Sequence, residues 1–391
     1  MKSETNDKQL LEDILSDEIL SERLMKGDLP EKGLTKSEIK LSNDFLRAVN
    51  INKVNIAPDD KAFLADQITG SIALAKKKRF LAWIGYAASL IIIAGLSFYF
   101  ITQNQPDIIK YAASISVEKS SESTQLMLPD DQTVRIEEAE SKIAYSKNGN
   151  TIVINASNEI NQPVENKGIA YNTVFVPYGK RSQVVLPDNS SIWLNSGSTL
   201  VYPVRFDKDK REVYLEGEAL FEITHDKDSP FHVLTKSLEV KVLGTVFDLS
   251  AYDEDSVINT ILEKGSVEIS YNKNLIEKSY TKISPGELAS FSVKDQLFVT
   301  SEVNTKDFTS WKDGYMALEK KSLESITRRL SRYYNVTIEF EDPELAKETF
   351  SGYLDLRSSA VQVLGMIAEM MDIQIIQTGK VIKISKKGTT I

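Results

Sequence analysis

The sequence contains no cysteine and only two histidines, His225 and His232. Without cysteine the chain has no thiolate metal site, no cysteine nucleophile and no disulfide, and this absence is neutral about its compartment. The histidines stand seven positions apart in expected strand and turn, and only Asp226 and Asp228 could add ligands, in loose spacing. We interpret both histidines as turn and surface residues and expect no metal and no cofactor.

The chain also lacks an excess of positive charge. Its 391 residues include 47 basic and 56 acidic side chains, for a net charge of -9. Phosphate binding needs a concentrated basic face. We therefore expect no direct nucleic-acid partner.

Sequence motifs for catalysis are missing too. No glycine-rich phosphate loop stands between a strand and a helix, and no G-x-S-x-G elbow occurs. "EGEALFE" places Glu216, Glu218 and Glu222 on one face of a strand, which could mimic the carboxylate pair of a hydrolase. Carboxylates at i and i+2 sit only about 7 Å apart on a strand, and an exposed face is the commoner explanation. We expect no enzyme, with a tethered hydrolase as a minor alternative.

One long apolar run stands out, "FLAWIGYAASLIIIAGLSFYFI" from Phe80 to Ile101, which carries no charge over 22 residues. As a helix it would span about 33 Å, the thickness of a bilayer core. Trp83, Tyr86 and Tyr99 lie towards its ends, where aromatic rings favour the headgroup region. This pattern predicts a transmembrane helix over 80–102.

The flanks of this run differ in charge. Lys76, Lys77, Lys78 and Arg79 precede it, and no basic residue follows it before Lys110. By the positive-inside rule, residues 1–79 are cytoplasmic and the rest lies across the membrane. We expect a single-pass protein with a cytoplasmic N-terminus.

The cytoplasmic part, 1–75, has helical periodicity throughout. Its short amphipathic helices can bury little by themselves, so they either form a tiny bundle or need a partner to complete their core. We favour a partner, and the expected binding face contains Leu11, Ile14, Leu15, Ile19, Phe45 and Leu46.

Beyond the run, 103–122 is expected to be a linker and 123–305 an all-β domain. Two related stretches, "LMLPDDQTVRI" and "VVLPDNSSIWL", each place Leu-Pro-Asp between alternating apolar residues. Proline presets a tight turn and Asp or Asn supports it, so each stretch predicts a β-hairpin. In the second, Val185 and Trp193 occupy the opposite face, which places that hairpin centrally. A sandwich, a barrel or stacked hairpins would each fit.

Aromatic residues of this domain could stack on sugars or fill its core. Because they fall within alternating apolar runs, we favour the core. The residues concerned are Trp193, Tyr202, Phe206, Tyr214, Phe221 and Phe231.

The segment 311–386 changes pattern again. Its periodicities predict strand, helix, strand, strand, helix, strand and strand, a compact α+β module that ends in a hairpin around Thr378 and Gly379. The whole chain is thus expected to be a multidomain membrane protein: a small all-α region, one transmembrane helix, an all-β domain and a C-terminal α+β domain.

Seven blocks of the β region carry a resemblance: "WLNSGSTLVYP", "REVYLEGEALFEI", "PFHV", "VKVLGTVFDLSAY", "LEKGSVEI", "SPGELA" and "WKDGY". Their order and spacing resemble the FecR-type transmembrane sigma-factor regulators in the Bacteroidetes style. The tail resembles the domain that follows in that group, related to the short signalling domain of secretins and TonB-dependent receptors. The motif positions, expected to be structural, are Pro187, Asp188, Trp193, Leu194, Asn195, Pro203, Gly217, Glu218, Gly244, Thr245, Gly265, Pro285, Gly286 and Trp311.

The resemblance implies a function. It implies that the cytoplasmic region binds an extracytoplasmic-function sigma factor, and that the β domain lies in the periplasm and responds to the signalling domain of an outer-membrane TonB-dependent transducer. It implies an inner-membrane location and release through an intramembrane or periplasmic protease. The chain departs from the group at Asp248, where Asn is commoner, and at Leu220, where an aromatic is usual. A membrane-tethered periplasmic glycan-binding protein without sigma-factor control is the alternative.

Overall fold

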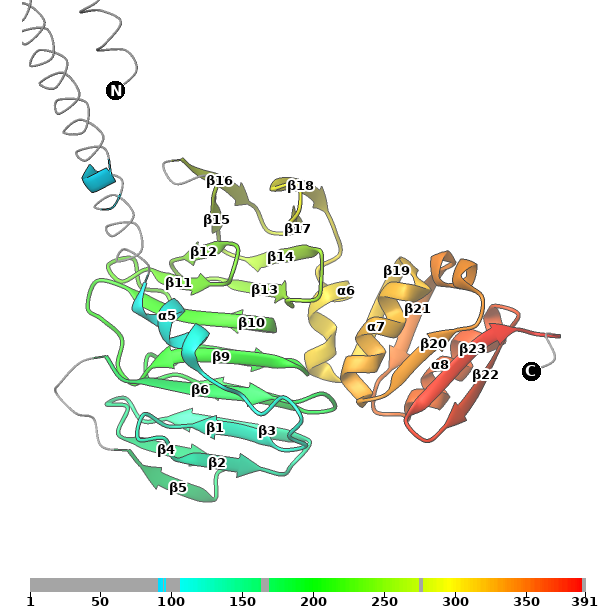
Figure 1. Cartoon of the computed structure of the whole chain (residues 1–391), viewed down its shortest axis with the longest axis horizontal. Helices are drawn as coiled ribbons and strands as arrows, with labels where there is room; N and C mark the ends of the chain where they lie inside the picture. Colours follow the sequence, from blue (N-terminus) through cyan, green and yellow to red (C-terminus); the bar gives the residue numbers. More distant parts are fainter. Residues whose placement is uncertain (1–90, 94, 96–105, 163–168, 274–276, 389–391) are drawn as a thin grey trace, which may run out of the picture. The chain divides into compact units, whose positions relative to one another are not determined.

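The computed structural model describes residues 91–93, 95, 106–162, 169–273 and 277–388 (Figure 1). The expected helices of 1–75 and most of the expected span 80–102 lie outside these residues. In the described part of the chain, no helix has the length and apolar character to cross a membrane. The chain divides into two compact units, Met1–Asn104 and Gln105–Ile391, and nearly all described residues belong to the second.

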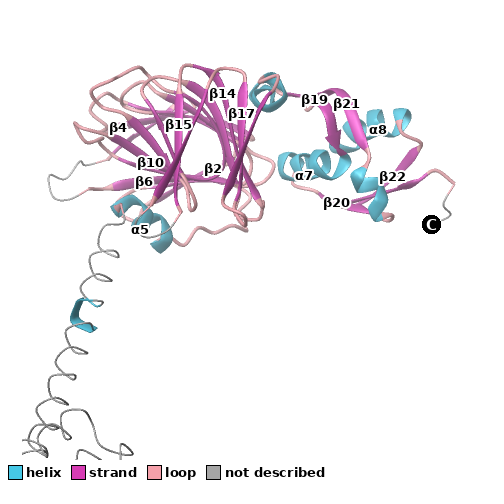
Figure 2. Cartoon of the chain, turned by 90° about the horizontal axis from the view of Figure 1, so that it is seen from above, coloured by secondary structure: helices cyan, strands magenta, loops and turns pink. Residues whose placement is uncertain are grey.

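The larger part of the second unit is a β-sandwich of two sheets that share the long strand β10, so the sequence correctly predicts an all-β architecture. Sheet A runs in the order β2 (Thr133–Ile136), β1 (Thr124–Met127), β6 (Tyr171–Val176), β9 (Ser198–Pro203), β10 (Arg211–Glu222), β11 (Phe231–Leu234), β12 (Glu239–Val242), β15 (Val267–Asn272), β16 (Lys278–Ile283). Sheet B runs β5 (Asn158–Asn161), β4 (Thr151–Ile154), β3 (Glu140–Tyr145), β7 (Arg181–Val185), β8 (Ser191–Leu194), β10, β13 (Val246–Ala251), β14 (Val257–Lys264), β17 (Glu287–Ser292), β18 (Leu297–Glu302). Figure 2, seen from above, shows the two layers of strands facing each other.

Alternate residues of both sheets point inward and form one apolar core. The rings of Phe221 and Phe247 stack at 4.8 Å, and the buried hydroxyls of Tyr145 and Tyr202 lie 2.7 Å apart. Tyr202, Phe221 and Phe231 belong to this core and Phe206 packs against it. The expectation of core aromatics therefore holds for four of the six residues named above. Trp193 and Tyr214 instead lie on the outer faces of the sheets.

Both Leu-Pro-Asp stretches form hairpins with the same turn. Strands β1 and β2 pair with Leu126 opposite Val134, and β7 and β8 pair with Val184 opposite Ile192. In each turn the residue after Asp adopts a left-handed conformation, Asp131 at φ 63° and Asn189 at φ 64°. Asp and Asn tolerate this region better than most residues, so the repeated sequence encodes a repeated backbone.

The expected linker contains a helix that the sequence analysis did not anticipate. Helix α5 (Asp107–Ser114) packs on the outer face of sheet A, with Ile108 only 1% exposed. The rings of Tyr111 and Tyr171 lie 4.9 Å apart. Ile108 and Tyr111 are three positions apart and share one helix face, so even a helix of 8 residues buries an apolar side. The segment 107–114 is thus part of the folded unit.

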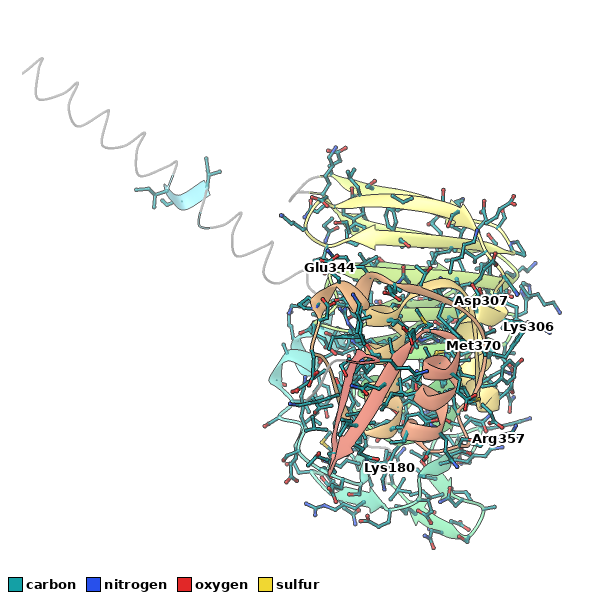
Figure 3. All side chains as sticks on the ribbon, turned by 90° about the vertical axis from the view of Figure 1, so that its right-hand side faces the viewer. Lys180, Lys306, Asp307, Glu344, Arg357 and Met370 are labelled. Carbon is teal, nitrogen blue, oxygen red and sulfur yellow. The ribbon has the colours of Figure 1, made fainter. Side chains whose placement is uncertain are left out.

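The C-terminal part begins with α6 (Lys306–Thr309) and the 3-10 turn η1 (Ser310–Asp313). It continues as β19 (Tyr315–Ser322), α7 (Leu323–Tyr334), β20 (Thr337–Phe340), the 3-10 turn η2 (Pro343–Lys347), β21 (Thr349–Asp355), α8 (Ala360–Met370), β22 (Ile373–Thr378) and β23 (Val381–Lys386). The order of helices and strands predicted from the sequence is confirmed. This C-terminal module has its own apolar core, and Figure 3 faces it, with Met370 labelled at the end of α8.

Candidate functional site

A row of outward-facing residues crosses sheet B, and one of them, Asp248, contacts Trp311 of η1. Each residue of the row lies directly opposite the next one in the neighbouring strand, so the row is contiguous on one face of the sheet. From β3 to β14 it contains Lys142, Gln183, Trp193, Leu220, Asp248 and Ile261. We call this set the cross-strand row.

Asp248 is the buried acidic member of this row, with no exposed surface. The indole Nε1 of Trp311 donates to its Oδ2 at 3.2 Å, and its Oδ1 has no hydrogen-bond partner in the described structure. Burial raises the pKa of the Asp248 carboxyl well above its usual value, and the charge of Glu218 raises it further. Asp248 thus favours the neutral form beneath the turn that leads into the C-terminal module.

Arg332, on α7, binds the sandwich through both terminal nitrogens of its guanidinium. Its guanidinium donates to both carboxylate oxygens of Asp255 at 2.8 and 3.1 Å and to Glu254 at 2.9 Å. It also lies 3.6 Å from the centre of the Tyr252 ring. The Arg332 side chain is only 9% exposed, so this bidentate and cation–π contact is shielded from water.

The C-terminal end of α7 is held by further contacts. The backbone N–H of Gly179 donates to the carbonyl of Arg332 at 2.9 Å, and the Arg181 guanidinium lies 4.0 Å from the ring of Tyr333. Arg328 adds a more exposed ion pair with Asp255 at 3.0 Å. We call the contacts of Asp248, Tyr252, Glu254 and Asp255 with Trp311, Arg328 and Arg332 the junction. It is held by polar and aromatic groups rather than by an extension of either apolar core.

The first motif residues make specific structural contacts. Asp188, in the turn opened by Pro187, accepts from the Nη1 of Arg211 at 2.7 Å, and Arg211 is only 4% exposed. Asn195 donates to the Oε2 of Glu218 at 2.6 Å, next to the row. Leu194 lies in the sandwich core, and Pro203 ends β9 opposite Tyr171.

The glycines of the motif permit tight backbone approaches. Gly217 has φ +108°, and a side chain there would come within 2.5 Å of the Ser198 hydroxyl. Gly265 has φ +103° and lies against Thr245, whose hydroxyl donates to the carbonyl of Ser266 at 3.0 Å. Gly244 lies against His225, and Gly286, which follows Pro285, donates its N–H to the carbonyl of Leu262 at 2.8 Å.

The histidines and carboxylates named above do not converge. His232 lies 2.6 Å from Glu239, and the hydrogen bond from His232, together with Lys278, lowers the pKa of Glu239 to about 2. Glu216 pairs with Lys119 at 2.7 Å, whereas Glu222 lies 3.6 Å from Lys312. Within the described ranges no group of three or more potential metal ligands occurs. His232, Glu216 and Glu222 thus each pair with a different neighbour.

Sequence reasoning missed most of the junction. Trp311 is among the motif positions, but Tyr252, Asp255 and Arg332 are not. The available signal was the complementary charge of "AYDEDS" (251–256) and "RRLSR" (328–332). The expected membrane-flanking residues Lys76, Lys77, Lys78, Arg79, Trp83 and Tyr99 lie outside the described residues. So does the expected sigma-binding face, Leu11, Ile14, Leu15, Ile19, Phe45 and Leu46.

Known proteins share both parts of this fold. The profile of the family described as "FecR protein" matches residues 172–268, and the profile described as "FecR, C-terminal" matches residues 315–384. Two crystal structures of a candidate anti-sigma factor from Parabacteroides distasonis ATCC 8503, at 1.65 and 2.50 Å, are similar to this chain at 28% identity. They cover 55% and 56% of this chain and 99% and 100% of their own chains, with TM-scores of 0.50 and 0.51.

No curated protein matches the chain. The two domains occur in the order that the sequence blocks implied, and the first spans much of the sandwich that contains the cross-strand row. The motif resemblance is therefore confirmed: residues 172–268 match the FecR domain, and residues 315–384 match the FecR C-terminal domain that follows it.

Proposed function

We propose that this protein is an anti-sigma regulator of the FecR type, without enzymatic activity, that binds an extracytoplasmic-function sigma factor through residues 1–75. The main observation that supports this proposal is the pair of matches to FecR domains, at 172–268 and 315–384, in one chain. The similarity to a candidate anti-sigma factor from Parabacteroides distasonis supports the same role. A helix over 80–102 would cross the inner membrane and place 123–305 and 311–386 in the periplasm.

In this proposal the C-terminal module receives the signal. Its described surface presents three large apolar side chains, Tyr353, Met370 and Ile376, exposed by 76%, 72% and 42%. Contiguous exposed apolar patches mark interaction surfaces, and in this proposal these three side chains contribute to one. The proposed partner is the signalling domain of an outer-membrane TonB-dependent transducer.

The junction offers a route for the signal into the sandwich. A partner can shift a conformational equilibrium only by binding one state better than another. Polar contacts such as that of Arg332 with Asp255 can break and re-form without disrupting either apolar core. Helix α5 would then pass the change from the sandwich to the membrane helix, and a protease acting near that helix could release the sigma factor.

Sigma-factor binding can be tested with the full chain in detergent. We expect an extracytoplasmic-function sigma factor to co-purify with it, and Leu15→Asp combined with Phe45→Asp to abolish recovery. Glu12→Gln, on the polar side of the expected helix that contains Leu15, serves as the control and should leave recovery of the sigma factor intact. Recovery of no sigma factor by the unaltered chain would contradict the proposal.

The topology can be tested separately with reporter fusions. A fusion after Arg79 should be active only as a cytoplasmic reporter, and a fusion after Lys110 only as a periplasmic one. Both fusions reporting the same compartment would exclude signal relay across the membrane.

A further inference from the structure

A groove of about 310 Å³ lies on the outer face of sheet B, beside η1. The strands β3, β7 and β8 supply one side, and Trp311 and Lys312 of η1 supply the other. Its volume is near the lower end of the roughly 300–1,000 Å³ range of small-molecule sites. The groove can hold a ligand of one or a few rings.

The chemistry of the groove is unusual for this chain. Both tryptophans of the described residues line it, and Trp193 belongs to the row rather than to the core. Gln183 lies directly opposite Trp193 and next to Lys142 in the parallel pair of β3 and β7. An indole flanked by an amide and an ammonium provides both an apolar surface and hydrogen-bond donors. This combination suits a sugar ring, which has apolar C–H faces and a rim of hydroxyls.

The charge of the groove opposes that of the chain. Lys142, Arg181 and Lys312 line it against a single lining carboxylate, Glu140, although the chain as a whole carries a net charge of -9. Arg181 pairs with Glu140 at 2.8 Å and Lys312 lies 3.6 Å from Glu222, so Lys142 is the lining cation without an ion pair among the described residues. Lys312 lies 5.0 Å from the centre of the Trp193 ring. An ammonium held beside the indole would meet a carboxylate on a sugar that packs against the same ring.

We propose that this groove binds an acidic sugar. The site lies on the same row as Asp248, two strands away, and its far wall is the turn whose Trp311 donates to Asp248. A bound sugar would therefore contact the connection between the sandwich and the C-terminal module. The groove would thus be a ligand-binding site separate from the region that binds the sigma factor.

The test is isothermal titration calorimetry on the full chain in detergent, with trigalacturonate as the acidic probe and galactotriose as the neutral one. We expect trigalacturonate to bind and galactotriose to bind at least tenfold more weakly. Trp193→Ala and Lys142→Ala should each weaken trigalacturonate binding at least tenfold, and Trp193→Phe should weaken it less. Lys241→Ala, which removes an exposed lysine from sheet A, is the charge-matched control and should bind as the unaltered chain does.

Absence of binding by either probe would overturn the proposal, as would equal binding by the Trp193→Ala and unaltered chains. Equal affinity for both probes would overturn the assignment of an acidic ligand. Because Trp193→Ala could perturb folding, circular dichroism must show native strand content, and Lys142→Ala provides an independent, exposed substitution. Sigma-factor recovery should be unchanged in both variants, so failure here is distinguishable from failure of the proposed function.

Discussion

At the scale of single residues, the buried carboxyl of Asp248 sets a pH dependence. Its pKa is raised by burial and by Glu218, so the folded protein holds this proton more tightly than the unfolded chain does. Its contribution to stability is therefore complete below the ordinary pKa of an aspartate, and it declines as pH rises through the raised value. Above that value the folded protein must hold an ionised carboxylate away from water.

We accordingly expect Asp248→Asn to raise the free energy of unfolding at neutral pH by about 1 kcal/mol or more, and to flatten its dependence on pH. The neutral amide can still accept from the Trp311 indole. Chemical denaturation from about pH 4 to about pH 8 measures the effect. Asp253→Asn, at an exposed carboxylate paired with Lys236, is the control and should keep the slope of the unaltered protein. The same slope in all three proteins would contradict our assignment of Asp248.

At the scale of structural elements, the two Leu-Pro-Asp hairpins make a matched experiment. Asp130 and Asp188 occupy the same turn position, and each accepts a backbone N–H two residues later, at 3.3 and 3.0 Å. Only Asp188 also pairs with an arginine, Arg211, at 2.7 Å. Asp188→Ala would leave that arginine buried without its counter-charge, whereas Asp130→Ala removes only a turn contact.

Removing one partner of a buried ion pair typically costs about 3–5 kcal/mol, and we expect Asp188→Ala to lie near the lower value because Asp188 is 19% exposed. Asp130→Ala should cost about 1 kcal/mol or less. Equilibrium denaturation of the two variants gives the comparison. Equal losses would show that Arg211 contributes little beyond the turn itself.

The same hairpins show what the sequence could and could not predict. Alternation of apolar residues and turn chemistry are local, so they correctly predict both hairpins and the order of helices and strands in the C-terminal module. The bond from Arg211 to Asp188 joins residues 23 positions apart, and that from Arg332 to Asp255 joins residues 77 apart. Such pairs depend on strand order and packing, for which a single sequence carries only complementary charge. Helix α5 was missed for a related reason, because its apolar side becomes evident only against Tyr171 and Val201.

At the scale of the whole molecule, the described unit has a large sandwich core and a separate core in the C-terminal module. Two cores joined through polar contacts can unfold as one cooperative body only while those contacts persist. The single side chain of Arg332 makes three of these contacts, with Tyr252, Glu254 and Asp255. Such polar contacts stabilise one arrangement of the sandwich and the C-terminal module. When the contacts break, the apolar core of each part stays intact.

We therefore expect Arg332→Ala to lower the stability of the C-terminal module by about 3 kcal/mol, because it leaves Asp255 with a weaker partner and uncovers the ring of Tyr252. In scanning calorimetry of the full chain, the module should unfold at a lower temperature than the sandwich, as a separate transition. Arg328→Ala is the control: it removes an arginine from the same helix that also binds Asp255 but is 46% exposed, and should shift unfolding far less. If both variants unfold like the unaltered chain, then the Arg332 side chain does not couple the modules, and a signal received by one must reach the other through the remaining contacts, such as Trp311 with Asp248 and Arg181 with Tyr333.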